Sequence, residues 1–253
     1  MNIEKAIEEF IKYTENYNLD GPRIEGKQKH SIRVMEISKE IAQGLRLTLE
    51  EIDIATLIGL LHDIARFEQY TQYHTFKDAQ SIDHGDLGVE ILNKDIRKYI
   101  ETDKYDETIK LAVKNHNKYK IQEGLTQKQE LFAKIIRDAD KIDILYESAE
   151  MFWKGRESEI EEATISEEVF EQISKNTQVK VETRKTPIDD VVSVIAFIFD
   201  INFKVSFEIL KKENYINRIL DRYDIKNIET KRKVENIRDI ANQYIERKIK
   251  ESE

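Results

Sequence analysis

The stretch Leu57-Ile-Gly-Leu-Leu-His-Asp-Ile-Ala-Arg-Phe-Glu68 places an adjacent histidine and carboxylate, His62 and Asp63, at the end of a strongly apolar run. Apolar residues recur there at the spacing of one helix face, at Ile54, Leu57, Ile58 and Leu61. His62 continues that face, so its ring is expected to point into the core, where a polar group needs a partner. Successive helical residues diverge by about 100°, so the pair can hold an ion between its side chains. The alternative is a hydrogen-bonded core histidine followed by a helix-end acid.

Composition favours a helical protein without thiol chemistry. The 253 residues suffice for one large domain or two small ones, and only two prolines and eight glycines interrupt them. The absence of cysteine excludes a disulfide framework, a thiolate nucleophile and a Cys-ligated zinc site. The net charge of −9 argues against a nucleic-acid polymer as a partner, because such partners need a broad basic face.

The sequence predicts neither an export signal nor a membrane anchor. The N-terminal residues 1–9 are acidic and amphipathic, unlike the apolar centre of a signal peptide. The longest apolar stretch, Val191 to Phe199, is too short to span a bilayer and contains Ser193. We therefore expect a cytoplasmic protein that has no membrane partner.

The periodic pattern predicts an all-α fold. Amphipathic helices are expected over residues 3–11 and 27–44. A third helix should begin at a capping box formed by Thr48 and Glu51 and end at the His-Asp pair.

The segment 67–83 has weak periodicity, and we expect it to be an ordered loop that covers the His-Asp pair. A second capping box, Thr126 with Gln129, should open a long helix. Polar residues with metal-binding side chains fall on this helix and on the two before it, at His84, His116 and Asp140.

The chain should divide into a core, residues 1–150, and a C-terminal helical extension, residues 151–253, packed on that core. The extension is expected to contain a final helix over 228–249 and a buried segment over 191–207. That segment is rich in Val, Ile and Phe, so a strand is the alternative, but its length and the preceding Thr186-Pro187 start favour a helix. One side of the final helix carries an apolar stripe, Val234, Ile237, Ala241, Tyr244 and Ile245. Packing within its own domain is the common use of such a stripe, and a homodimer through the C-terminal helices is the alternative.

Several histidines and one aspartate fall on the apolar faces of predicted helices, where core residues are expected. The chain has five histidines, and His30, His62 and His116 extend apolar stripes, as Asp140 does on a later helix. One inward histidine is usually structural. Four helices that each present such a side chain to one core would leave several buried groups unsatisfied unless a metal joined them. Imidazole and carboxylate ligands suit Mn, Fe, Co, Ni and Zn.

The sequence motifs around these residues resemble those of the HD superfamily of metal-dependent phosphohydrolases. The resemblance covers about residues 25–146 and is carried by Lys29-His-Ser-Ile-Arg-Val34, Leu60-Leu-His-Asp-Ile-Ala65, Asp83-His-Gly-Asp-Leu-Gly88 and Arg137-Asp-Ala-Asp-Lys-Ile-Asp143. It implies an all-α bundle whose metal site lies between the helices.

The resemblance also implies a set of metal ligands, position by position. The family's four basic ligands around a first metal match His30, His62, Asp63 and Asp140. His84 and His116 match the extra histidines of members that hold two metals, in which Asp63 would bridge the ions.

Two further residues, Asp138 and His74, are of ligand type but fall outside this set. Asp138 is the nearest rival to Asp140, but it falls on the other side of its helix from Phe132 and Ile136. His74 has no counterpart in the family, and we expect a loop residue or a neighbour of the ligands.

The resemblance implies hydrolysis of a phosphate ester or anhydride, of a nucleotide or similar small metabolite, by a metal-activated hydroxide. The cofactor would be a divalent transition metal, two ions in all. The candidate catalytic residues are Asp63, Arg66 and Lys118. Arg66 lies one turn beyond His62 and could bind a substrate phosphate or orient Asp63, with a surface ion pair as the alternative. Lys118, shortly after His116, is a similar candidate.

Two other functions fit the same residues. Some relatives hold two irons and oxidise an organic substrate with oxygen. The other alternative is a regulatory module that binds metal and nucleotide without turnover.

Overall fold

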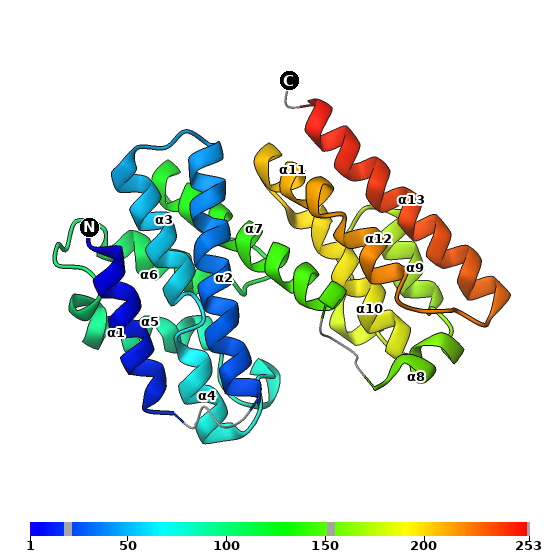
Figure 1. Ribbon diagram of the computed structural model, residues 1–253, viewed down its shortest axis with the longest axis horizontal. Coiled ribbons are helices and arrows are strands. Elements are labelled where there is room, and N and C mark those ends of the chain that lie inside the picture. The colour runs from blue at the N-terminus through cyan, green and yellow to red at the C-terminus, as the bar shows by residue number, and fades with distance from the viewer. Residues whose placement is uncertain (18–21, 151–154, 252–253) are drawn as a thin grey trace. The chain divides into compact units, whose positions relative to one another are not determined.

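The computed structural model describes residues 1–17, 22–150 and 155–251, and every regular element in these ranges is a helix (Figure 1). The predicted all-α fold is confirmed. The chain forms two compact units, Met1–Asp140 and Lys141–Glu253, and their boundary falls within one helix, α7 (Gln127–Glu150). The division expected after residue 150 adjoins residues 151–154, which lie outside the described ranges. That division and the packing of the extension on the core stay predictions.

The first unit is built around α3. It contains α1 (Ile3–Glu15), α2 (Pro22–Gly44), α3 (Leu49–Leu61), α4 (Ala65–Tyr73), α5 (His84–Asp95), α6 (Asp106–Asn115), the first part of α7, and the short 3-10 helices η1 (Asp78–Gln80) and η2 (Ile96–Lys98). α3 lies against α1, α2 and α6 (Figure 1). Every residue from Ile54 to Leu61 is buried, as in a helix that is apolar on all sides. The residues that follow this helix therefore enter the core of the unit.

Both predicted capping boxes are present. The Thr48 hydroxyl accepts from the Glu51 amide at 3.3 Å, and the Glu51 carboxylate accepts from the Thr48 amide at 3.1 Å. Thr126 and Gln129 make the same reciprocal pair at 3.3 and 2.9 Å. Because a cap sets where a helix starts, these pairs fix the register of α3 and α7 and of the polar residues they carry.

The loop predicted over 67–83 is wrong in its first part, because residues Ala65–Tyr73 form α4. Phe67 is buried and packs edge-on against Phe10, with ring centroids 5.9 Å apart. The buried positions of α4 include Gln69, so the apolar pattern is too sparse to reveal a helix of nine residues. His74 ends α4 in the left-handed conformation, at φ 53°, and is exposed.

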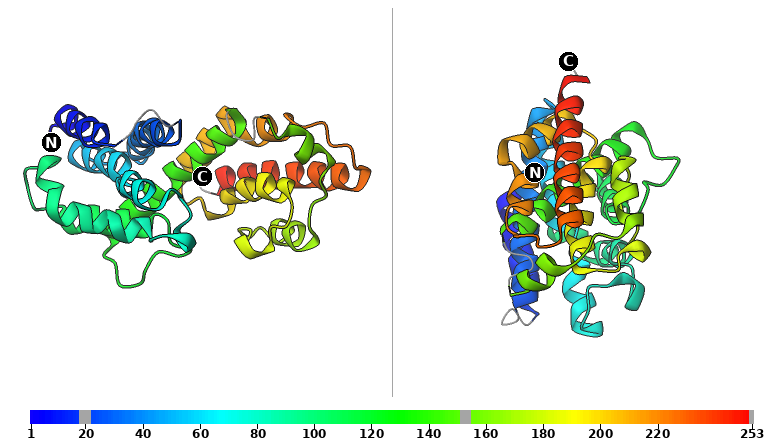
Figure 2. Two further views of the ribbon diagram at one scale, coloured as in Figure 1. Left: turned by 90° about the horizontal axis from the view of Figure 1, so that it is seen from below. Right: turned by 90° about the vertical axis from the view of Figure 1, so that its right-hand side faces the viewer.

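The second unit is organised along its last helix, α13 (Ile228–Glu251), which lies against α9, α11 and α12 (Figures 1 and 2). The other helices of this unit are α8 (Glu157–Glu162), α9 (Glu167–Ser174), η3 (Val181–Thr183), α10 (Pro187–Ile195), η4 (Ala196–Asp200), α11 (Lys204–Glu213) and α12 (Tyr215–Leu220). Four of the five stripe residues of α13 are buried: Val234, Ile237, Ala241 and Ile245. The stripe packs within its own unit, and the homodimer stays a prediction.

The single helix predicted over 191–207 is wrong. The chain forms α10, η4 and α11 there, with Ile201 extended between the last two. Apolar residues of all three elements are buried, so burial alone did not distinguish one long helix from a broken one. Among the described residues, no helix combines the length and the apolar character needed to cross a bilayer.

Gly59 sets how closely α2 and α3 approach. A Cβ atom at this position would lie 2.7 Å from the Ser38 hydroxyl and 2.8 Å from backbone atoms of Val34 and Met35 on α2. Backbone atoms cannot move aside as a flexible side chain can. The absence of a side chain at Gly59 therefore keeps the two helices in contact one turn before His62.

Gly59→Ala is expected to lower the free energy of unfolding by about 1–3 kcal/mol, because α2 and α3 must separate. Gly26→Ala is the matched control, since a Cβ atom at Gly26 on α2 meets nothing within 4 Å. The control should stabilise the protein by about 0.5–1 kcal/mol through helix propensity. Urea denaturation of both variants measures the difference; equal stability would contradict the close approach.

Candidate metal centre

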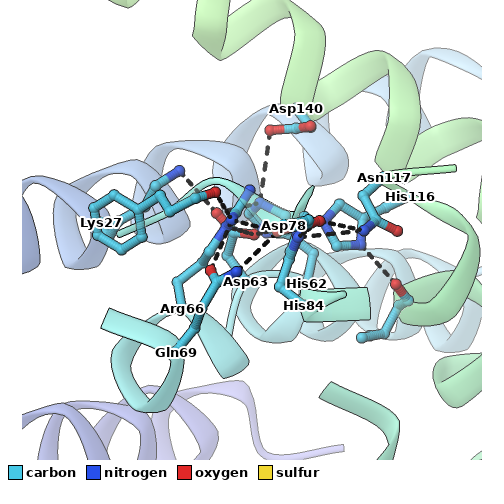
Figure 3. Close-up of polar contacts among 12 residues, drawn as sticks. Lys27, His62, Asp63, Arg66, Gln69, Asp78, His84, His116, Asn117 and Asp140 are labelled. Atoms are coloured by element: carbon cyan, nitrogen blue, oxygen red, sulfur yellow. Dashed lines mark hydrogen bonds and ion pairs between the residues drawn. The ribbon is translucent and has the colours of Figure 1, made fainter. Parts of the chain in front are cut away.

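Six ligand-type side chains converge in the first unit, each from a different helix except for one adjacent pair. They are His30 of α2, His62 and Asp63 directly after α3, His84 at the start of α5, His116 directly after α6, and Asp140 of α7. Figure 3 shows the last five of these residues. The four histidines and Asp63 are buried, and the Asp140 side chain is 17% exposed. The fold therefore brings together all six residues that the sequence predicted as ligands.

A first cluster consists of His30, His62 and Asp140. The Nε2 atoms of the two histidines lie 3.2 Å apart. Asp140 Oδ1 lies 3.2 Å from His30 Nε2 and 3.7 Å from His62 Nε2. Two ligands bound at about 2.0–2.2 Å to one ion lie roughly 3.0–3.5 Å apart. These separations fit a single ion held by the cluster.

A second cluster consists of Asp63, His84 and His116. The Nε2 atoms of the two histidines lie 2.9 Å apart, and each is 3.4 Å from Asp63 Oδ1. The other oxygen of Asp63, Oδ2, lies 3.6 Å from His30 Nε2 and 3.7 Å from His62 Nε2. Asp63 thus presents one oxygen to each cluster, as a carboxylate between two ions would.

The protonation of the rings supports this interpretation. His62 Nδ1 lies 2.8 Å from the Gly59 carbonyl, and His116 Nδ1 lies 2.6 Å from the Val113 carbonyl. A carbonyl oxygen only accepts, so each Nδ1 carries the hydrogen and each Nε2 of a neutral ring carries a lone pair. Such nitrogens, buried and turned toward other acceptors, are stabilised by a cation between them. The residues present therefore fit a divalent metal.

Burial keeps these groups in the state that a metal requires. Burial lowers the pKa of His62 below its usual value, and it lowers the pKa of His84 to about 4 against the raising effect of Asp78. Burial opposes ionisation of Asp63, yet neighbouring cations, led by Lys27, hold its pKa well below its usual range. His62 and His84 are thus neutral and Asp63 is ionised at neutral pH.

Arg66 lies in a network beside the second cluster. Its Nε is 3.4 Å from Asp63 Oδ1, and its Nη1 donates to the Phe76 carbonyl, Asp78 and Gln69 at 2.7, 3.1 and 2.8 Å (Figure 3). The side chain is 15% exposed. Of the roles expected from the sequence, this geometry favours orienting Asp63.

Lys118 pairs with two acids of the loop and helix that carry His84. Its Nζ lies 2.6 Å from Asp83 and 2.9 Å from Asp86. Two carboxylates next to a lysine offset its positive charge, so its attraction for a phosphate is weaker. Its role as a phosphate-binding residue stays a prediction.

Four residues that the sequence did not identify contact the candidate ligands or neighbouring residues that position them. Lys27 Nζ lies 2.9 Å from Asp63 Oδ2, and Asp78 Oδ2 lies 2.6 Å from His84 Nδ1 (Figure 3). Asn117 Nδ2 donates to Asp78 at 3.1 Å, and Arg137 donates to the His116 carbonyl at 3.3 Å. Only Lys27 left a signal, because it precedes His30 by one helical turn and shares its face. The other three follow from contacts between distant segments.

Asp138 and His74 belong to neither cluster. Among the described residues, the ligand atoms that gather with His30 and His62 belong to Asp140, not to its rival Asp138. His74 lies exposed at the end of α4, as expected for a histidine outside the ligand set.

A family model described as HD domain matches residues 28–145. This part of the chain is an HD superfamily domain. Comparisons with curated proteins and with solved structures gave no match. HD domains are commonly metal-dependent hydrolases, and membership implies divalent metal binding. Among the described residues, His30 with His62 and Asp140, and His62 with Asp63 and His116, are groups that could hold such an ion.

The metal-free protein should lose stability on acidification. His84 has a pKa of about 4 when folded, against about 6.5 for an ordinary histidine, so the unfolded chain takes up the proton first as pH falls. The stability that His84 contributes is complete above about pH 6.5 and is lost as pH falls through about 4. The expected loss is on the order of 3 kcal/mol.

Urea denaturation of chelator-treated protein between pH 4 and 7 measures this loss. His84→Asn should flatten the profile in this window, whereas His74→Asn, a change at an exposed helix end, should leave it unaltered. An acid limb of the same slope in His84→Asn would show that the buried ring is not its source.

Proposed function

We propose that this HD domain is a phosphohydrolase that uses two divalent transition-metal ions to cleave a phosphate ester or anhydride of a nucleotide or similar small metabolite. The observation that carries the proposal is the carboxylate of Asp63, which presents Oδ2 to the first cluster and Oδ1 to the second. Each cluster could hold one ion, and two ions on either side of one carboxylate would supply the chemistry for attack on phosphorus.

When bound, the metals supply a nucleophilic water at neutral pH and neutralise charge that develops on phosphoryl oxygens. The protein's own residues hold these positions. Asp63 sets the spacing between the two clusters, and Arg66 keeps its carboxylate in place at 3.4 Å. The helix-end carbonyls of Gly59 and Val113 orient the rings of His62 and His116.

Lys27 is our candidate for the cation that binds a substrate phosphate. Its Nζ lies 2.9 Å from Asp63 Oδ2 and 5.8 Å from the centre of the Phe76 ring, and its side chain is 23% exposed. It therefore borders the first cluster and also reaches solvent. Metal ions held by Asp63 would share its charge, and the ammonium group of Lys27 would then be able to pair with a phosphoryl oxygen of the substrate. Arg66 and Lys118 are more fully committed to protein partners.

The other expectations from the sequence belong to this proposal and rest on the sequence alone. They are a cytoplasmic location, a phosphorylated small molecule as partner rather than a nucleic-acid polymer or a membrane, and a homodimer as an alternative to the monomer.

Metal analysis of protein purified without added metal, followed by a phosphoester and phosphoanhydride screen with that metal restored, tests the hydrolase. Asp63→Asn keeps the side-chain volume but removes the charge shared by both clusters. It should lower metal occupancy and reduce turnover by more than about 100-fold, because loss of a ligand exceeds the 10–100-fold effect of losing a ligand's partner.

Three outcomes would overturn the proposal. Full activity in Asp63→Asn would remove Asp63 from the mechanism. Oxygen-dependent oxidation by a mixed-valence iron pair, without phosphate release, would show the oxygenase. Binding of metal and nucleotide without turnover across the panel would show the regulatory module.

Lys27→Gln is expected to lower kcat/KM by about 10–100-fold, since a charge-assisted hydrogen bond contributes about 1.5–3 kcal/mol. Lys29→Gln is the matched control, because Lys29 is exposed on the same helix and pairs with Glu25. Steady-state kinetics of Lys118→Gln in the same series decides between the two candidate lysines: a larger loss there than in Lys27→Gln would reverse their assignment.

A further inference from the structure

The histidines of the site differ in what holds their second ring nitrogen. His62 and His116 each follow the last residue of a helix, where carbonyls of the final turn lack helical partners. The Nδ1 of His62 donates to the Gly59 carbonyl, and the Nδ1 of His116 donates to the Val113 carbonyl, in each case three residues earlier. These two rings are therefore oriented by their own helices.

His84 stands at the opposite end of its helix. It is the first residue of α5, directly after the N-cap Asp83, so no helical turn precedes it to supply a carbonyl. Its Nδ1 instead lies 2.6 Å from Oδ2 of Asp78, a residue of η1 in the preceding segment. The partner of this ring is a charged group and comes from a different element.

Asp78 is itself held from several sides. Its Oδ2 also accepts from Asn117 at 3.1 Å, and its Oδ1 accepts from Gln69 at 2.8 Å and from Arg66 at 3.1 Å (Figure 3). Asn117 Nδ2 also lies 3.2 Å from His84 Nδ1 and 3.1 Å from Asp83 Oδ1. The carboxylate is thus fixed relative to α4 and to the residue that follows His116.

A carboxylate behind an imidazole has two effects on a metal ligand. It fixes the hydrogen on Nδ1, which leaves the lone pair on Nε2, and it makes that nitrogen a stronger donor than a carbonyl partner does. The Nε2 of His84 lies 2.9 Å from His116 Nε2 and 3.4 Å from Asp63 Oδ1. Both effects act on the second cluster.

We propose that Asp78 is a positioning residue that sets the metal affinity of the second cluster through His84, independently of the first cluster. The inference rests on the proposed two-metal centre. It makes the two positions unequal: the second is strengthened by a charged partner drawn from outside the ligands' own helices, and this strengthening requires the carboxylate of Asp78.

Asp78→Asn removes the charge at nearly constant volume. We expect metal titration of the purified protein, followed by calorimetry and elemental analysis without substrate, to show a 10–100-fold weaker second binding step and an unchanged first step. Excess metal should restore kcat. Asp86→Asn is the matched control, since it removes one carboxylate from an exposed position of α5 and should leave both steps unchanged.

Two comparisons separate positioning from general support of the fold. Gln69→Ala removes a hydrogen bond to Asp78 and those to Ser81 and Ile82 but keeps the carboxylate. Equal weakening of the second step in Gln69→Ala and Asp78→Asn would overturn the proposal, because loss of local order would then suffice. Nitrogen-15 NMR of wild-type, metal-free protein should show His84 protonated at Nδ1, and protonation at Nε2 would overturn it even if Asp78→Asn fails to fold.

The wild-type titration separates this inference from the function on which it rests. Binding of fewer than two ions would overturn the two-metal centre and this inference with it. Two ions bound without phosphatase activity would overturn the hydrolase alone, and the unequal response of the two steps in Asp78→Asn would still support the role of Asp78.

Discussion

The carboxylate of Asp63 faces two sets of buried imidazoles at once, and the rest of the site depends on this arrangement. Its Oδ2 is turned to His30 and His62, and its Oδ1 to His84 and His116. A buried carboxylate is costly unless cations compensate it. Lys27 supplies part of that compensation at 2.9 Å. The lone pairs that the neighbouring rings direct toward Asp63 are acceptors, so further positive charge is needed among them, which is the physical basis for a metal centre.

Helix ends explain how an all-α unit can orient so many ligands in a small volume. The final turn of a helix has carbonyls without partners, and α3 and α6 use them to hold His62 and His116. Arg137 of α7 donates to the carbonyls of Asn115 and His116 at 3.0 and 3.3 Å, which ties the end of α6 to the next helix. The first turn of a helix has no unpaired carbonyls. His84, the first residue of α5, therefore depends on the carboxylate of Asp78 from another segment. The second cluster thus contains a histidine with a charged partner, unlike His62 of the first cluster, whose partner is a carbonyl.

Features of this protein that arise from interactions between residues close in sequence are predictable, whereas those that arise from contacts between distant segments are not. Capping boxes join residues three apart, and apolar faces repeat every three or four residues, so both could be recognised locally at Thr48 and along α3. The loop predicted over 67–83 failed because the buried face of α4 includes Gln69, whose partners lie at Asp78, Ser81 and Ile82. The helix predicted over 191–207 failed because apolar composition does not reveal where a buried segment bends.

The sequence by itself determined the all-α class, the HD-type order of histidines and aspartates, and the faces on which His30, His62 and Asp140 lie, because helical periodicity and local motifs encode them. Only the tertiary structure decided the assignment of charged partners. Arg66 turned toward Asp63 and Asp78, Lys118 toward Asp83 and Asp86, and Lys27 toward Asp63. A charged side chain on a helix can reach several partners, and its choice depends on which distant segments the packing of apolar faces brings within a few ångströms.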